Sequence, residues 1–242
     1  MLAALLAACC SHTLRVASTP VSMVDTTIGG PFPELCVFDL DACLWDKEMF
    51  EMPSVPTVEH VVLGDLNGRG EGVAGVMSGR YKISLHPGAL FALQQHADGA
   101  FGTMKVALAS SANTPFAEKI GRASLALLEV TPGLTVWDLL MRDFNGVDVN
   151  QIGRQPPLSP NKSRTHFPRL REATGIGFDK MLFFDDCNWG DHCGQVAAAC
   201  VEEASGKGVV TMRTLLGLRE CDFRDGMAAY ATAQSETGAG VS

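Results

Sequence analysis

The chain has 242 residues, of which 46% are hydrophobic and 19% charged, enough apolar material for one domain of ordinary size. Its net charge of −8, with no Lys/Arg-rich run, argues against a nucleic-acid-binding protein. No apolar stretch reaches the roughly 18 residues that a membrane helix requires. We therefore expect neither nucleic-acid nor membrane partners.

Residues 1–33 differ in composition from the rest of the chain. No acidic residue precedes Asp25, Arg15 is the one basic residue, and Ala, Ser and Thr are frequent. Acid-poor, Ser-rich leaders are typical of organelle targeting peptides, although those usually contain more arginine. We interpret residues 1–33 as a targeting peptide of an intracellular protein destined for a plastid or mitochondrion. A disordered tail of a cytoplasmic protein is the alternative.

The eight cysteines are irregularly spaced and include no CxxC pair, which argues against a zinc site. We expect reduced thiols in a reducing compartment.

From residue 34 to residue 235, short apolar runs alternate with amphipathic stretches, and residues 236–242 are expected to form a flexible tail. Strands that are apolar throughout and separated by helices indicate a parallel sheet covered on both faces. The sequence thus predicts an α/β domain with a three-layer, Rossmann-like sheet. The predicted strands are Leu35–Phe38, Lys105–Ala109, Lys180–Phe184 and Gly208–Thr211, and the predicted helices are Pro87–His96, Thr114–Leu128, Thr165–Thr174, Asp191–Ala204 and Gly226–Gln234.

Two segments interrupt this alternation. Between Trp45 and His86, closely spaced glycines and short β-branched runs predict a β-hairpin flap with a mobile Gly-rich tip and a turn at Asn67-Gly68. The polar, proline-containing segment 143–161 is expected to have little regular structure.

Acidic and hydroxyl side chains follow the predicted strands, at the edge of the sheet where open parallel sheets bind ligands. Several carboxylates in one crevice favour a hard cation such as Mg²⁺, and a hydroxyl and an ammonium suit phosphate oxygens. One carboxylate could attack phosphorus and a second could protonate the leaving oxygen. The residues are Asp39, Asp41, Ser110, Asp185, Asp186 and Asn188, with Lys162 before the helix that leads into the last strand.

The stretches "FDLDACLW", "ALASSAN" and "MLFFDDCN", together with Lys162, resemble the four motifs of haloacid dehalogenase-like phosphatases. The resemblance is closest to the magnesium-dependent phosphatase family of the acid phosphatase type, and it covers residues 34–230. It implies a Mg²⁺-dependent phosphatase with an aspartyl-phosphate intermediate and a minimal or absent cap domain. Phosphotyrosine-type and sugar-phosphate substrates, from small molecules or proteins, are associated with that family.

The resemblance also implies roles for individual residues. Asp39 would be the nucleophile and a Mg²⁺ ligand, and Asp41 the general acid/base and a ligand through its backbone carbonyl. Asp186 would complete the metal site. The phosphoryl oxygens would be held by Ser110 and Lys162, with Ser111 as a further substrate-binding residue. Asp185 and Asn188 are expected to act through water or through neighbouring residues. Trp45 and Phe50 are candidates either for the substrate entrance or for the core.

Several positions depart from the family pattern. Ala42 and Cys43 replace a Tyr-Thr pair, and a thiol hydrogen-bonds more weakly than a hydroxyl. Ser111 replaces a basic residue, and Lys162 lies one residue further from His166 than the pattern has it.

These departures leave a catalytically weakened or inactive interaction module as an alternative function. A phospho-receiver domain is a further alternative. The chain order of the motifs disfavours the receiver, because its adjacent acids would lie on the first strand.

Overall fold

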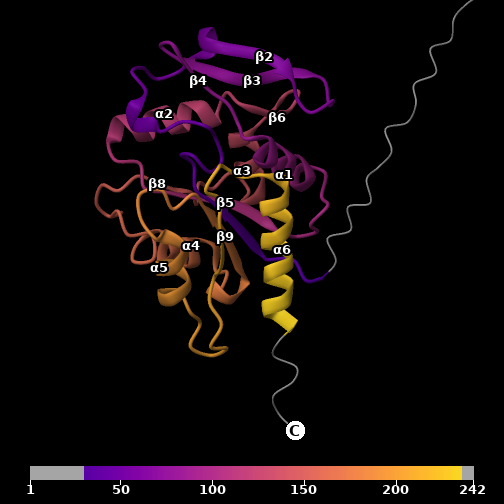
Figure 1. Ribbon diagram of the computed structural model, residues 1–242, viewed down its shortest axis with the longest axis vertical. Helices are drawn as coiled ribbons and strands as arrows, with labels where there is room; N and C mark the ends of the chain where they lie inside the picture. The colour runs from indigo at the N-terminus through magenta and orange to yellow at the C-terminus, as the bar shows by residue number, and fades with distance from the viewer. Residues whose placement is uncertain (1–29, 236–242) are drawn as a thin grey trace, which may run out of the picture.

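The computed structural model describes residues 30–235, so the predictions for residues 1–29 and 236–242 lie outside the described part of the chain. Five parallel strands form the central sheet in the order β10-β9-β1-β5-β8, which confirms the predicted α/β fold (Figure 1). The strands are β1 (Leu35–Phe38), β5 (Lys105–Ser110), β8 (Gln151–Ile152), β9 (Met181–Asp185) and β10 (Val210–Arg213).

Alternating side chains of the central strands enter two separate hydrophobic layers. Phe38 and Phe184 belong to one layer, whereas Val37 and Phe183 belong to the other. This period of two is the geometry of a strand buried on both faces. The first layer is covered by α1 (Pro87–Ala97), α2 (Pro115–Leu125), α3 (Val136–Asp143) and α6 (Glu220–Ser235), and the second by α4 (His166–Thr174) and α5 (His192–Ala199).

A small antiparallel sheet lies at the top of Figure 1, formed by β2 (Val61–Asp65), β3 (Glu71–Ser78) and β4 (Tyr81–Ile83). The expected turn at Asn67-Gly68 is present, with φ of 55° and 76°. The expected Gly-rich mobile tip is wrong for residues 71–78, because they form the central strand β3. Gly72 allows this packing, since a Cβ there would lie 2.6 Å from Leu66 Cδ1.

Other elements differ from the sequence-based expectation at their ends or were not expected. The helix α5 is shorter than predicted and α6 begins earlier. The short elements not foreseen are α3, β8, the hairpin of β6 (Glu129–Thr131) and β7 (Leu134–Thr135), and the 3₁₀ turns η1 (Met49–Glu51), η2 (Val58–His60) and η3 (Phe178–Lys180).

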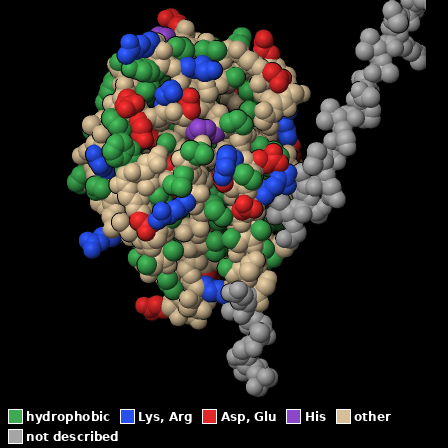
Figure 2. Space-filling view, in the orientation of Figure 1, with side chains coloured by type: hydrophobic (Ala, Val, Ile, Leu, Met, Phe, Trp, Pro, Cys, Tyr) green, Lys and Arg blue, Asp and Glu red, His purple; other side chains and the backbone are tan. Residues whose placement is uncertain are grey.

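The described surface has mixed polarity. Figure 2 shows acidic, basic and hydrophobic side chains interspersed on one face, without a continuous basic stripe on that face. Within residues 30–235, no helix combines the length and the apolar character needed to span a membrane. The six cysteines of this range are free thiols.

Candidate active site

A tight turn after β1 presents the first two acids. The backbone N–H of Asp39 still continues the sheet, donating to Phe184 O at 2.9 Å. Immediately afterwards Leu40 O accepts from Leu44 N at 2.9 Å, and Ala42 adopts a left-handed conformation with φ of 53°. This conformation is uncommon for a residue other than glycine. The chain thereby leaves the sheet and reverses, with Asp39 and Asp41 at the rim.

Asp39, Asp185 and Asp186 form a buried cluster whose carboxylate oxygens lie within 4.8 Å of one another. Burial raises the pKa of Asp186 to about 7, and the neighbouring Asp39 and Asp185 add to the rise. Burial likewise raises the pKa of Asp39, although Lys162 opposes it. Asp39 Oδ1 is buried without a hydrogen-bond partner in the described residues. Three close carboxylates with spare lone pairs are a donor set that fits a hard divalent cation.

Lys162 is buried beneath this cluster. Its Nζ lies 2.8 Å from Asp39 Oδ1 and 2.6 Å from Asp185 Oδ2, although only the second contact has hydrogen-bond geometry. Burial alone would lower the pKa of Lys162, but Asp185 and Asp39 raise it overall. Burial would raise the pKa of Asp185, but Lys162 and His192, whose Nδ1 is 3.2 Å from Asp185 Oδ2, lower it. Lys162 therefore keeps part of the cluster ionised.

Asp41 lies apart from the cluster, and its side chain is held by two donors. Trp45 Nε1 donates to Oδ1 at 2.9 Å, and Met49 N donates to Oδ2 at 3.0 Å. Burial raises the pKa of Asp41 well above its ordinary value, and the charge of Asp39 adds to this. Its surroundings therefore favour the protonated form of Asp41 more than water does. The expected metal contact through its backbone carbonyl stays a prediction.

Behind the first motif, Cys43 is fully buried and pairs with a residue distant in sequence. Thr214 Oγ1 donates to Cys43 Sγ at 3.3 Å, and Thr214 N donates to Asp185 O at 2.9 Å. The Ala42-Cys43 departure is therefore accommodated by a contact that reaches the backbone of the acidic cluster.

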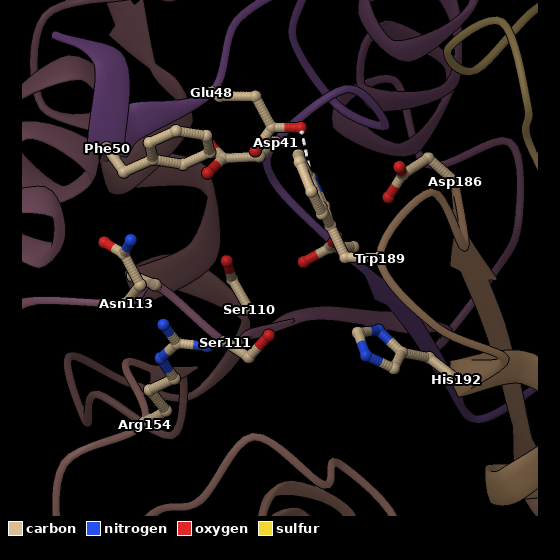
Figure 3. Close-up of a pocket in the computed structure, with 12 residues that line it drawn as sticks. Asp41, Glu48, Phe50, Ser110, Ser111, Asn113, Arg154, Asp186, Trp189 and His192 are labelled. Atoms are coloured by element: carbon tan, nitrogen blue, oxygen red, sulfur yellow. Dashed lines mark hydrogen bonds between the residues drawn. The ribbon is translucent and has the colours of Figure 1, made fainter.

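The acids open onto a cavity of about 450 Å³ (Figure 3). Ser110, buried at the end of β5, lies on its wall beside Ser111. Lys162 does not line it, so contact between this lysine and a phosphoryl group remains a prediction. The lining residues are Asp39, Asp41, Glu48, Phe50, Ser110, Ser111, Ala112, Asn113, Arg154, Asp186, Trp189 and His192.

Several lining residues escaped the sequence-based reasoning. Trp189 is 74% exposed, its Nε1 donates to Glu48 Oε1 at 3.0 Å, and its ring centroid is 6.0 Å from that of Phe50. Arg154 enters from the loop after β8. No spacing pattern marks these residues, because they come from separate loops. Of the two alternatives left open for Phe50 and Trp45, Phe50 takes the first and lines the cavity, whereas Trp45 takes the second and is fully buried in the core.

A family model described as acid phosphatase matches residues 31–233. The chain belongs to this acid phosphatase family. Membership confirms the resemblance drawn from the four motifs. A comparison with curated proteins gave no match.

Solved structures with a similar chain trace include two phosphatases. One is the N-terminal part of the protein BF1531 from Bacteroides fragilis, containing a phosphatase domain complexed with Mg. The two sequences are 17% identical and the TM-score is 0.41. The match covers 84% of the present chain but 40% of the Bacteroides chain. The other is the cobalt-bound deoxy-D-mannose-octulosonate 8-phosphate phosphatase YrbI from Haemophilus influenzae, 13% identical, with a TM-score of 0.39 and coverage of 87% and 94%.

Proposed function

We propose that the protein is a Mg²⁺-dependent phosphatase that hydrolyses phosphomonoesters through an aspartyl-phosphate intermediate. The observation that carries this proposal is the pairing of two acids in different surroundings at one strand end. The ammonium of Lys162 lies next to Asp39 and opposes the effect of burial on its pKa. Asp41 is half-buried between two neutral donors, Trp45 Nε1 and Met49 N, and desolvation raises its pKa well above its ordinary value. One carboxylate is thus suited to attack and the other to donate a proton.

The metal-binding residues would be Asp39 and Asp186, together with the backbone carbonyl of Asp41. Asp185 lies in the same cluster, but its carboxylate is already paired with the Lys162 ammonium and contacts the His192 ring. When bound, Mg²⁺ would neutralise the clustered acids and stabilise charge on the transferring phosphoryl group.

In the first half-reaction, a carboxylate oxygen of Asp39 attacks phosphorus while the bond to the leaving oxygen breaks. Asp41 gives its proton to that oxygen, so that the alcohol or phenol departs neutral. In the second half-reaction the Asp41 carboxylate takes a proton from water as the water attacks the aspartyl-phosphate. Inorganic phosphate is released, and both aspartates return to their starting states.

The remaining residues would hold the phosphoryl group. Ser110 and Ser111 line the cavity with their hydroxyl groups and would donate to phosphoryl oxygens. Lys162 would support them by its charge. On the basis of the family resemblance, we propose phosphotyrosine-type or sugar-phosphate compounds as its substrates.

Hydrolysis of p-nitrophenyl phosphate tests this function. We expect turnover with Mg²⁺ that EDTA abolishes, and a loss on the order of 10³-fold or more in Asp39→Asn, as for other nucleophile replacements. Asp225→Asn, an exposed acid outside the cavity, is the charge-matched control and should retain full activity. Turnover that survives both EDTA and Asp39→Asn would contradict the mechanism.

A further inference from the structure

Arg154 is a half-buried cation on the wall of the cavity. Within residues 30–235, its guanidinium has no hydrogen-bond or ion-pair partner, although five N–H donors are available. Figure 3 shows Arg154 beside Ser111, across the cavity from Asp186. A permanently charged group without a protein acceptor at this place is available to a ligand.

The two neighbours of Arg154 are attached to the segment that carries the serines, Gly153 by its backbone and Gln155 by its side chain. Gly153 N donates to Ser110 O at 2.8 Å, and Gln155 Nε2 donates to Asn113 O at 3.3 Å. His166 Nε2 lies 3.1 Å from Ser110 O and 3.0 Å from Gly153 O, which joins the same two segments again. Arg154 is therefore held against the cavity by its neighbours and is not carried on a free loop tip.

The charges around Arg154 also leave it available. Glu118, whose carboxylate lies close to Gly153, forms an ion pair with Arg122 at 2.9 Å. Lys162 is buried against the acidic cluster. The lining of the cavity includes four acids. Among the described lining residues, Arg154 is the one Lys or Arg.

We propose that Arg154 is a specificity-determining residue that binds a second anionic group, carried by the leaving group of the substrate. This inference rests on the proposed phosphatase function. The reacting phosphoryl group belongs near Asp39 and the metal side at Asp186, whereas Arg154 lies beside Ser111, across the cavity from Asp186. A guanidinium binds carboxylate or phosphate in a two-pronged geometry that a neutral group of the same shape cannot match.

The aromatic wall narrows the class of substrate. Phe50 and Trp189 form an edge-to-face pair on the cavity, at 6.0 Å between ring centroids. Exposed aromatic rings at a binding site suit planar, partly apolar groups. The substrates would accordingly be phosphomonoesters with a planar leaving group that carries a carboxylate or a further phosphate.

Two matched substrates test the proposal, 4-carboxyphenyl phosphate and 4-carbamoylphenyl phosphate, which differ in one charge. With Mg²⁺, the wild-type protein should prefer the carboxylate in kcat/KM. Arg154→Gln should reduce kcat/KM for the carboxylate substrate about tenfold or more, the usual effect of losing a charged hydrogen bond, and change the carboxamide substrate little. Arg154→Lys should retain part of the preference for the carboxylate. Arg142 is an exposed arginine outside the cavity, so Arg142→Gln should retain the whole preference.

Two results would overturn the inference. One is a wild-type protein without preference for the carboxylate. The other is an equal loss on both substrates in Arg154→Gln, which would place the guanidinium on the phosphoryl group or in the folding of the loop.

Affinity measurements separate this inference from the proposed function. Isothermal titration with 4-carboxybenzylphosphonate and 4-carbamoylbenzylphosphonate requires no turnover, since their carbon–phosphorus bond is not hydrolysed. If neither phosphate ester is hydrolysed, the proposed function fails. A carboxylate preference in binding that Arg154→Gln removes would still support the role of Arg154, and equal affinities would refute it.

Discussion

Lys162 brings an ammonium into the protein interior only because two carboxylates surround it. Removing one member of such a buried ionic group leaves the others without compensation. We expect Lys162→Met to lower the free energy of unfolding by about 3–5 kcal/mol at neutral pH, measured by urea denaturation. The loss should shrink in acid, where Asp39 and Asp185 can be protonated.

The control is Lys180→Met, which removes an exposed ion pair with Glu34 at 2.7 Å. Exposed pairs contribute little, so this variant should unfold at the same urea concentration as wild type. Equal effects of the two substitutions would show that the Lys162 contacts do not stabilise the fold.

Cys43 tests whether the departure from the family motif weakens the site. We expect Cys43→Thr to retain or raise phosphatase activity, because a threonine hydroxyl would form a stronger hydrogen bond with Thr214 Oγ1 than the thiol does. Cys43→Ala, which removes the contact, should reduce kcat. Kinetics with p-nitrophenyl phosphate separate the variants, and a large loss in Cys43→Thr would show that the thiol has a role of its own.

At the level of elements, α6 depends on a glycine where it crosses the sheet. A Cβ at Gly226 would lie 2.5 Å from Phe184 Cζ. The Phe184 ring cannot easily yield, because it is stacked on Phe38 at 5.3 Å and on Phe223 at 5.7 Å. We expect Gly226→Ala to destabilise the protein by about 1–3 kcal/mol through overpacking, although alanine favours helix by about 1 kcal/mol. Urea denaturation measures the difference.

Ala228→Gly supplies the matched comparison on the same helix. Ala228 is exposed, so this change should report helix propensity alone, a loss of about 1 kcal/mol. If Gly226→Ala instead stabilised the protein by a similar amount, the close contact with Phe184 would not be a constraint on α6.

The elements that the sequence predicts are those whose pattern is local. The apolar run at Leu35–Phe38 is reproduced as β1, because a strand buried on both faces needs no alternation. The strand β3 is not predicted, because glycines are typical of loops, and the need for Gly72 becomes visible only in the structure, where a Cβ would lie 2.6 Å from Leu66 Cδ1. In the site, the two acids of motif one could be predicted. Arg154 could not, because its place depends on hydrogen bonds from its neighbours to another loop.

For the whole molecule, the site lies where segments from both layers of the core meet. Phe38 and Phe184 lead into Asp39 and Asp185 from one strand pair, while α4 and α5 lie against the other face of the sheet. His166, at the start of α4, contacts the carbonyl that ends β5. Stability and the geometry of the site are therefore coupled through this buried imidazole.

That coupling predicts a pH dependence of folding. Burial lowers the pKa of His166 to about 4, from an ordinary value of 6.5, and the charge of Lys162 adds to the effect. Between these values the unfolded chain binds a proton that the folded protein does not. The stabilisation is therefore fully present above pH 6.5 and is lost as the pH falls toward 4, by up to about 3 kcal/mol.

Urea unfolding of wild type and His166→Gln at pH 7.5 and pH 5 measures this contribution. The glutamine amide can still donate to Ser110 O or Gly153 O but does not titrate in this range. Other groups titrate in both proteins, so the comparison isolates the imidazole. The free energy of unfolding should fall more steeply with acid in wild type than in the variant. Parallel pH profiles would mean that His166 accepts its proton in the folded state as readily as in the unfolded chain.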